Sequence, residues 1–354
     1  MTRGLELNID IGALAKNYRT IENRLQGQSQ MSVAVKADAY GLGIEKLAPL
    51  FYELGCRNFF VARTGEAMEL NNILPKKRQI YVLDGVKSFD ENILFKNNNI
   101  TPVVNTLHQM RYVRDIPVVL HFDTGMNRLG LSFNSIQKIK RLEADIKFIM
   151  THAASADEPN NIQTDQQFKN FARIRQHFKN IPASFANSAA SFSNSEWHLD
   201  LVRPGIALYG GESLPHDQTH IENVVSLYAP VLQTRSLLKG ETVGYGATYK
   251  AERPIETATL GIGYADGLFR QLSNTGSVYY RGQKCPIIGR VSMDLTIIDI
   301  SNCSPKPKTD DMVEILGPYQ SVDDLARDAD TIGYDVLTRL GKSIKKCYSN
   351  ESIS

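Results

Sequence analysis

The sequence predicts an α/β fold in which an N-terminal (β/α)8 barrel of the TIM type is followed by a mostly-β domain. Eight short apolar segments, with helical patterns between several of them, occupy roughly the first 200 residues, and this rhythm is the signature of such a barrel. Beyond residue 220 the pattern changes to segments rich in β-branched and aromatic residues. A chain of 354 residues also exceeds what one hydrophobic core usually organises. We therefore expect two domains, residues 1–220 and 221–354, with the first few residues able to pair with the β domain.

Within the barrel, a helix is expected first, because apolar residues recur there at helical spacing: Ile11, Leu14, Tyr18, Ile21 and Leu25. The strands that follow are mostly continuous apolar runs, which is typical of parallel strands buried on both faces. Helical patterns lie between several of them, as at residues 44–54 and 65–72. The expected strands cover residues 31–35, 58–62, 79–83, 100–104, 116–122, 146–151, 183–186 and 201–208.

The polar stretch at residues 210–220 is interpreted as the linker to the second domain. Turn residues then punctuate the chain, as at Arg281-Gly282 and residues 304–308. The expected strands of the second domain lie within residues 224–237, 255–262, 277–280 and 295–300.

The bulk composition excludes several classes of function. Acidic and basic residues nearly balance at a formal charge of +2, which gives no basis for a nucleic-acid or membrane-surface partner. The four cysteines are scattered without a CxxC pair, and there is no HExxH, so neither a disulfide framework nor a metal site is expected. No signal peptide and no membrane-spanning run is evident, and we expect a cytoplasmic protein.

The first candidate for chemistry is Lys36, which directly follows the first expected barrel strand in the segment AVKADAYG at residues 34–41. Catalytic residues of such barrels lie at the carboxyl ends of the strands. Desolvation at the barrel mouth would lower the pKa of the amine and make it a nucleophile able to form a Schiff base. A lone lysine in this place more often reaches out to solvent, so the interpretation depends on the other residues of the rim.

Polar segments follow the later strands as well. Ser188 is expected to begin a helix, whose first turn could cradle a phosphate together with the amides of Gly205 and Ile206. The aspartates Asp38 and Asp123 are interpreted first as caps or turn formers. The segments in question are HFDTGMNR at 121–128, TH at 151–152, NSAA at 187–190, RPGI at 203–206, VGYGATY at 243–249, GYADG at 263–267 and RVSMD at 290–294.

Taken together, in this order and over nearly the whole chain, these segments resemble the alanine racemase family, fold-type III enzymes that use pyridoxal 5′-phosphate. The resemblance implies that the chain interconverts L- and D-alanine and supplies D-alanine for bacterial peptidoglycan. Lys36 would hold the cofactor and act as one catalytic base, with Tyr245 as the other base on the opposite face. Arg128 and the backbone amide of Met293 would bind the substrate carboxylate, and Tyr264 would line the substrate entrance.

The same resemblance implies the cofactor contacts and the assembly. Arg203 would face the pyridine nitrogen, and His152 would link Arg203 towards Tyr245. Tyr245 and Met293 would reach the site from the second subunit of a homodimer. The residues expected to contact the cofactor are Lys36, Tyr40, His152, Asn187, Ser188, Arg203, Gly205, Ile206 and Tyr334.

One position departs from the family pattern. Many members carry a lysine, often carbamylated, seven residues before the equivalent of Arg128, where it orients the arginine. This chain has His121 there. A neutral imidazole could accept a hydrogen bond from Arg128, whereas a protonated imidazole would repel it.

Three alternatives stay open at this stage. The chain could be a broader racemase of small amino acids such as serine, or a fold-type III decarboxylase. Decarboxylases typically place an acidic residue where this chain has Arg203. The non-enzymatic alternative is a pyridoxal-phosphate carrier, although such proteins resemble the barrel alone.

Overall fold

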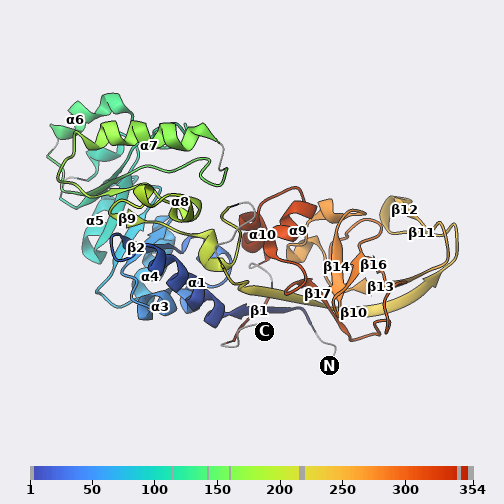
Figure 1. Ribbon diagram of the computed structural model, residues 1–354. Helices are drawn as coiled ribbons and strands as arrows, with labels where there is room; N and C mark the ends of the chain where they lie inside the picture. Colours follow the sequence, from blue (N-terminus) through green and yellow to red (C-terminus); the bar gives the residue numbers. More distant parts are fainter. Residues whose placement is uncertain are drawn as a thin grey trace.

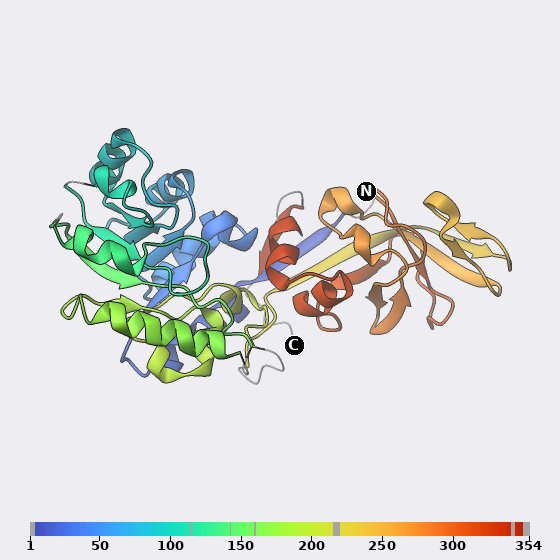
Figure 2. The same cartoon turned by 90° about the horizontal axis from the view of Figure 1, so that it is seen from above.

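The computed structural model describes residues 4–113, 115–141, 143–158, 161–214, 220–340 and 344–349. Two lobes are joined side by side, with the barrel strands and their helices in one lobe and a β-rich sheet in the other (Figures 1 and 2). Both parts of the predicted fold class are confirmed.

The first lobe is an eight-stranded parallel sheet in the order β8-β7-β6-β5-β4-β3-β2-β9. Backbone hydrogen bonds from Asp200 to Ala183 (3.0 Å) and from Arg203 to Ala186 (2.9 Å) join the two end strands and bring the sheet to near closure. The strands are β2 (Gln30–Ala34), β3 (Asn58–Val61), β4 (Gln79–Val82), β5 (Ile100–Val104), β6 (Val118–His121), β7 (Ile146–Met150), β8 (Ala183–Ser184) and β9 (Leu201–Val202).

Helices surround this barrel. The apolar stripe expected near the N-terminus forms α1, whose residues Leu14, Tyr18 and Ile21 are buried. The α-helices of this lobe are α1 (Ile11–Arg24), α2 (Lys36–Tyr40), α3 (Ile44–Glu53), α4 (Thr64–Ile73), α5 (Phe89–Asn98), α6 (Ile136–Lys140), α7 (Ile162–Arg175) and α8 (Ser188–Ser193). Short 3-10 turns are η1 (Gln109–Arg111), η2 (Phe133–Ser135), η3 (Ser195–Trp197) and η4 (Ile206–Tyr209).

The last barrel strand is shorter than expected. Residues 201–208 were predicted as one strand, but β9 ends at Val202 and η4 begins at Ile206. Pro204 has no amide hydrogen to donate to a sheet ladder, and this explains the early end of the strand. Of the predicted linker at residues 210–220, residues 215–219 lie outside the described part of the chain.

The second lobe is built on a mixed sheet in the order β15-β14-β17-β10-β1-β18, with β13 paired to β10 and β16 to β13. Its strands are β1 (Glu6–Asp10), β10 (Val225–Leu237), β13 (Ile255–Leu260), β14 (Ser277–Tyr280), β15 (Gln283–Pro286), β16 (Thr296–Asp299), β17 (Met312–Leu316) and β18 (Lys346–Ser349). The hairpin of β11 (Thr242–Val243) and β12 (Tyr249–Lys250), the helices α9 (Val322–Asp328) and α10 (Gly333–Leu340), and the turns η5 (Tyr245–Ala247), η6 (Tyr264–Asp266) and η7 (Arg270–Leu272) complete it.

Two features of this sheet bear on the site. β1 runs antiparallel to β10 and parallel to β18, so both ends of the described chain lie in the second sheet. The long strand β10 extends away from the barrel, and the hairpin of β11 and β12 lies at the far end of the molecule (Figure 1). Within the described ranges, none of the helices is both long and apolar enough to cross a membrane.

Candidate active site

A cavity at the carboxyl end of the barrel strands brings together every residue expected to contact a cofactor. Lys36 enters it directly after β2 and Val35, while His152, Ser188 and Arg203 enter after β7, β8 and β9. Tyr334 comes from α10 of the second lobe. The cavity is lined by Ala34, Lys36, Tyr40, Phe60, Leu83, Met150, His152, Asn187, Ser188, Arg203, Gly205, Ile206 and Tyr334.

The amine of Lys36 is partly removed from water. Burial lowers the pKa of Lys36, and the positive charge of Arg128 lowers it further. Glu66 and Asp84 act in the opposite direction. A lowered pKa increases the fraction of neutral amine, which is the form that acts as a nucleophile or a base.

A left-handed turn follows this lysine. Ala37, Asp38, Ala39 and Tyr40 all have positive φ values between 51° and 58°. Such values are rare for residues that carry a Cβ, and they persist where the surrounding structure holds them. Glu66 helps to do so, because its carboxylate accepts a hydrogen bond from the amide of Ala37 at 2.6 Å.

The turn delivers Tyr40 to the cavity. Its ring packs between those of Tyr209 and Tyr334, with ring centroids 4.6 and 5.8 Å away. A Cβ on Gly205 would lie only 2.1 Å from the hydroxyl oxygen of Tyr40. Glycine at position 205 therefore lets the backbone approach this phenol.

Hydroxyl and amide groups of Ser188, Asn187 and their neighbours also line the cavity. Ser188 begins α8, and its hydroxyl accepts hydrogen bonds from the amides of Gly205 (2.8 Å) and Ala207 (3.3 Å). The side chain of Asn187 caps the same helix by accepting a hydrogen bond from the amide of Ala190 at 3.0 Å. The serine hydroxyl keeps its own hydrogen to donate into the cavity.

The phenols of Tyr40 and Tyr334, which also line the cavity, stay protonated at neutral pH. Burial raises the pKa of Tyr40. Burial, followed by the charges of Asp157 and Asp323, raises the pKa of Tyr334 to about 12. Together with Ser188 they provide hydrogen-bond donors suited to an anionic group such as a phosphate.

Arg203 supplies a buried cation. Its guanidinium donates hydrogen bonds to the backbone oxygens of Thr151 (2.6 Å) and Phe185 (3.4 Å) and to the hydroxyl of Ser184. Burial lowers the pKa of Arg203 to about 9, so the side chain remains protonated at pH 7. By contrast, burial and then the charge of Arg203 lower the pKa of His152 far below its usual value. The imidazole is therefore neutral, and the positive charge here belongs to the arginine.

Arg128 lies in the loop after β6. Asp123 forms the start of this loop, and its carboxylate accepts hydrogen bonds from the amides of Gly125, Met126 and Asn127 at 2.9 to 3.1 Å. The loop then returns to β6, where Leu131 donates to the backbone oxygen of His121 at 2.7 Å. Arg128 is exposed in the single chain, and its charge acts on Lys36, His121 and His152.

His121 is bound by Asn105, a residue that the sequence analysis did not single out. Nδ1 of His121 lies 2.7 Å from the side-chain oxygen of Asn105. The nitrogen of that amide already donates to Leu83 (2.8 Å) and Val103 (3.0 Å), so the amide oxygen faces His121 and can only accept. The hydrogen of the imidazole is thereby placed on Nδ1. Asn105 directly follows β5, and this position at a strand end was the signal that could have found it.

Burial, then the charge of Arg203, lowers the pKa of His121 to about 4, with Asp123 opposing and Arg128 adding to the effect. His121 is therefore neutral, and its Nε2 is a hydrogen-bond acceptor.

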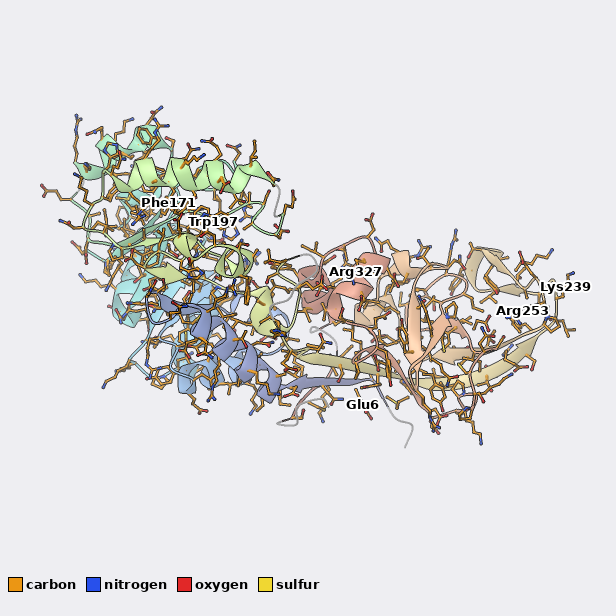
Figure 3. All side chains as sticks on the ribbon, viewed as in Figure 1. Glu6, Phe171, Trp197, Lys239, Arg253 and Arg327 are labelled. Atoms are coloured by element: carbon orange, nitrogen blue, oxygen red, sulfur yellow. The ribbon has the colours of Figure 1, made fainter. Side chains whose placement is uncertain are left out.

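Four predicted site residues are not among those that line this cavity: Arg128, described above, and Tyr245, Tyr264 and Met293. Tyr245 is 72% exposed in η5, next to the hairpin of β11 and β12. Figure 3 labels Lys239 and Arg253, which mark this far end of the second lobe. Met293 is 54% exposed and Tyr264 44% exposed, and their loops are joined by hydrogen bonds from Tyr264 to Ser292 and from Ala265 to Met293. A single chain thus does not bring Tyr245 and Met293 to Lys36.

No group of three His, Cys, Asp or Glu side chains in the described ranges could hold a metal ion. The cavity instead combines one amine, one guanidinium and several hydroxyl donors. This set fits a cofactor that carries an aldehyde and a phosphate.

Comparisons with known proteins agree with this chemistry. Residues 9–213 match the family described as "Alanine racemase, N-terminal domain", and residues 224–348 match "Alanine racemase, C-terminal domain". An alanine racemase of Brucella canis is 40% identical over 97% of this chain and 93% of its own length. A relative from Rhizobium johnstonii, named "Alanine racemase, catabolic", is 42% identical over 97% of this chain and 94% of its own.

Solved structures of alanine racemases are also similar to this chain. The alanine racemase of Bartonella henselae, crystallised with covalently bound pyridoxal phosphate, superposes with a TM-score of 0.94 at 37% identity, over 98% of this chain and 100% of that one. The biosynthetic alanine racemase of Pseudomonas aeruginosa gives 0.92 at 31% identity, over 98% and 99%.

Proposed function

Because the chain belongs to the alanine racemase family, we propose that it interconverts L- and D-alanine with two bases, Lys36 and Tyr245. The enzyme is an isomerase. The observation that carries the proposal is the cavity that gathers Lys36 with the expected cofactor contacts, while Tyr245 stands exposed and available to another subunit.

The cofactor is pyridoxal phosphate, which when bound withdraws electrons from the α-carbon of the amino acid and so makes its hydrogen acidic. Lys36 would hold it covalently, and Arg203 would donate a hydrogen bond to its pyridine nitrogen. The remaining contacts would be Tyr40, His152, Asn187, Ser188, Gly205, Ile206 and Tyr334.

Lys36 is proposed to move a proton at one face of the α-carbon. Its lowered pKa favours the neutral amine that accepts the proton. Inversion requires a second base on the opposite face, because one fixed base would return the proton to the side from which it came. Tyr245 of the partner subunit is proposed as that base, with Met293 of the partner subunit donating its amide to the substrate carboxylate and Tyr264 lining the entrance.

Arg128 is proposed to bind the carboxylate of alanine. The neutral His121, whose Nδ1 hydrogen bonds to Asn105, presents Nε2 as an acceptor for this guanidinium. A hydrogen bond from Arg128 to Nε2 would orient the arginine in place of the lysine that many family members use here.

The proposal requires a homodimer in which each cavity takes residues from both chains. Lys36→Ala and Tyr245→Phe proteins should each be inactive alone. Mixing them with subunit exchange should restore activity at one of the two sites of each mixed dimer, or up to roughly a quarter of the wild-type rate for random pairing in a C2 pair. Confirmed mixed dimers without any recovery would place both bases in one chain.

The activity itself is measured by circular dichroism of L-alanine and of D-alanine during incubation with the enzyme. Both solutions should approach zero ellipticity. Reduction with borohydride followed by peptide mapping should find the cofactor on Lys36, and an adduct on another lysine would overturn that assignment.

We propose that the cell uses the D-alanine for peptidoglycan. Relatives carry both catabolic and biosynthetic names, so the role has to be tested in the source organism. Deletion of the gene should make growth depend on added D-alanine. A strain that grows without it but cannot use alanine as a carbon source would show a catabolic role instead.

A further inference from the structure

The left-handed turn after Lys36 is held partly from outside the barrel, by two residues of the second sheet. Four successive residues with a Cβ adopt an unfavourable conformation here, and such a turn needs contacts that fix it. Four backbone hydrogen bonds close this segment, from Ala39 to Val35, from Gly41 to Ala37, from Leu42 to Ala39 and from Gly43 to Asp38, at 2.7 to 3.2 Å. Beyond the turn, Glu66 of α4 and the rings around Tyr40 also contact it, and two further contacts come from β18 of the second sheet.

Asp38 is the first point of attachment. One carboxylate oxygen accepts a hydrogen bond from the amide of Ile44 at 2.7 Å. The other accepts one from the amine of Lys346, also at 2.7 Å, and forms an ion pair with it. The side chain of Lys346 is 18% exposed and that of Asp38 is 48% exposed, so only the lysine side of the pair is shielded from water.

Tyr348 is the second point of attachment. Its hydroxyl donates to the backbone oxygen of Leu42 at 2.9 Å. A Cβ on Gly43, whose φ is +99°, would lie 2.1 Å from the same hydroxyl oxygen. Gly43 therefore permits both the backbone direction and the close approach of the phenol.

The strand that carries these two residues is itself fixed in the second sheet. β18 pairs in parallel with β1, with Lys346 opposite Leu7 and Tyr348 opposite Ile9. Leu7 and Ile9 are fully buried. The second sheet thus provides a rigid base from which Lys346 and Tyr348 reach the turn.

We propose that Lys346 and Tyr348 are positioning residues that hold the left-handed turn and thereby fix the amine of Lys36 for its part in the reaction. This inference rests on the proposed function of Lys36. Neither residue is among those that line the cavity, so both act through the backbone of residues 37–43.

The test uses the full-length holoenzyme with Lys346→Met, Tyr348→Phe and Lys346→Arg. A reaction can slow roughly 100-fold when its reactive group is displaced by about 1 Å. A loosened turn should displace the amine of Lys36 by less than that, so we expect kcat to fall about tenfold in Lys346→Met and Tyr348→Phe. KM for alanine should change less than about threefold, because Arg128 lies in another loop. Lys346→Arg keeps the charge and should retain most of the activity. The matched control is Lys345→Met, since Lys345 is the exposed neighbour outside the strand.

Hydrogen exchange of the turn amides gives a readout independent of activity. The amides of Ala39, Gly41 and Gly43 should exchange faster in Lys346→Met and Tyr348→Phe than in the wild type and in Lys345→Met, while those of the strand β6 stay unchanged. Tyr348→Phe removes only one oxygen atom, so it still tests the inference if Lys346→Met does not fold.

Two outcomes would overturn the inference. Either exchange stays unchanged, or it rises while kcat does not fall. A wrong assignment of Lys36 would give a different result. The Lys36→Ala protein would then keep its cofactor and its activity, whatever the variants of Lys346 and Tyr348 do.

Discussion

Replacing Gly205 by alanine should weaken cofactor binding without unfolding the barrel. Gly205 has φ −134° and ψ −88°, so its conformation is not the left-handed one that favours glycine. The new Cβ would nevertheless lie 2.1 Å from the hydroxyl oxygen of Tyr40 and 2.9 Å from its Cζ. The phenol would have to move by more than about 1 Å to reach ordinary van der Waals separation.

The surroundings decide where the phenol can go. Tyr40 is 5% exposed and packs against the rings of Tyr209 and Tyr334. The open direction is the cavity itself, which the phenol would then share with the cofactor. Overpacking of this kind costs about 1–3 kcal/mol, which corresponds to roughly 5- to 150-fold weaker binding of pyridoxal phosphate.

The assay is titration of the apoenzyme with pyridoxal phosphate, followed by absorbance, together with the thermal midpoint of the apoenzyme. Gly65→Ala is the matched control, because a Cβ at Gly65 meets nothing within 4 Å, and its affinity for the cofactor should equal that of the wild type. An equal affinity in Gly205→Ala would refute the idea that this glycine admits Tyr40 to the site.

Four further predictions follow from the same geometry. The pKa of His121 lies near 4 in the fold against 6.5 ordinarily, so unfolding takes up a proton between these values. The free energy of unfolding should fall by up to ~1.4 kcal/mol per pH unit as the pH drops from 6.5 to 4, and urea titrations of His121→Asn should show less of this fall. Asn105→Ala frees the imidazole and should raise KM for alanine roughly fivefold in steady-state assays while kcat changes little. Tyr334→Phe removes one donor to a charged group and should raise the dissociation constant of the cofactor about tenfold by the same titration. Serine should be racemised more slowly than alanine but not excluded, because a site that accepts the methyl group of alanine rejects one added hydroxyl poorly; faster turnover of lysine or arginine would contradict an alanine site.

Much of the barrel could be predicted because its strands are continuous apolar runs with polar residues at their ends. Ile100–Val104 was predicted to the residue, and most other strands within one or two residues. Residues 201–208 were the exception, since apolar character alone hides the break at Pro204. Apolar periodicity reports burial, and both a strand and a 3-10 turn can be buried.

The cavity residues were predictable for a related reason. Lys36 and Ser188 follow strand ends, and the family resemblance indicated which of the other residues would meet them. Asn105 and Glu66 were missed, although both lie close behind strands β5 and β3. Lys346 and Tyr348 could not have been found, because their contacts with Asp38 and Leu42 span more than 300 positions and depend on how the two sheets dock.

The exposure of Tyr245 has a consequence for the chemistry of the single chain. Lys36 lies in a cavity with the expected cofactor contacts of its own chain, whereas Tyr245 is 72% exposed at the far end of that chain. A monomer would therefore hold one base only. Such a base could remove the α-hydrogen and return it to the same face, which exchanges the hydrogen with solvent but leaves the configuration unchanged. In the proposed homodimer the second face receives its base from the partner, so inversion, unlike exchange, would require both chains.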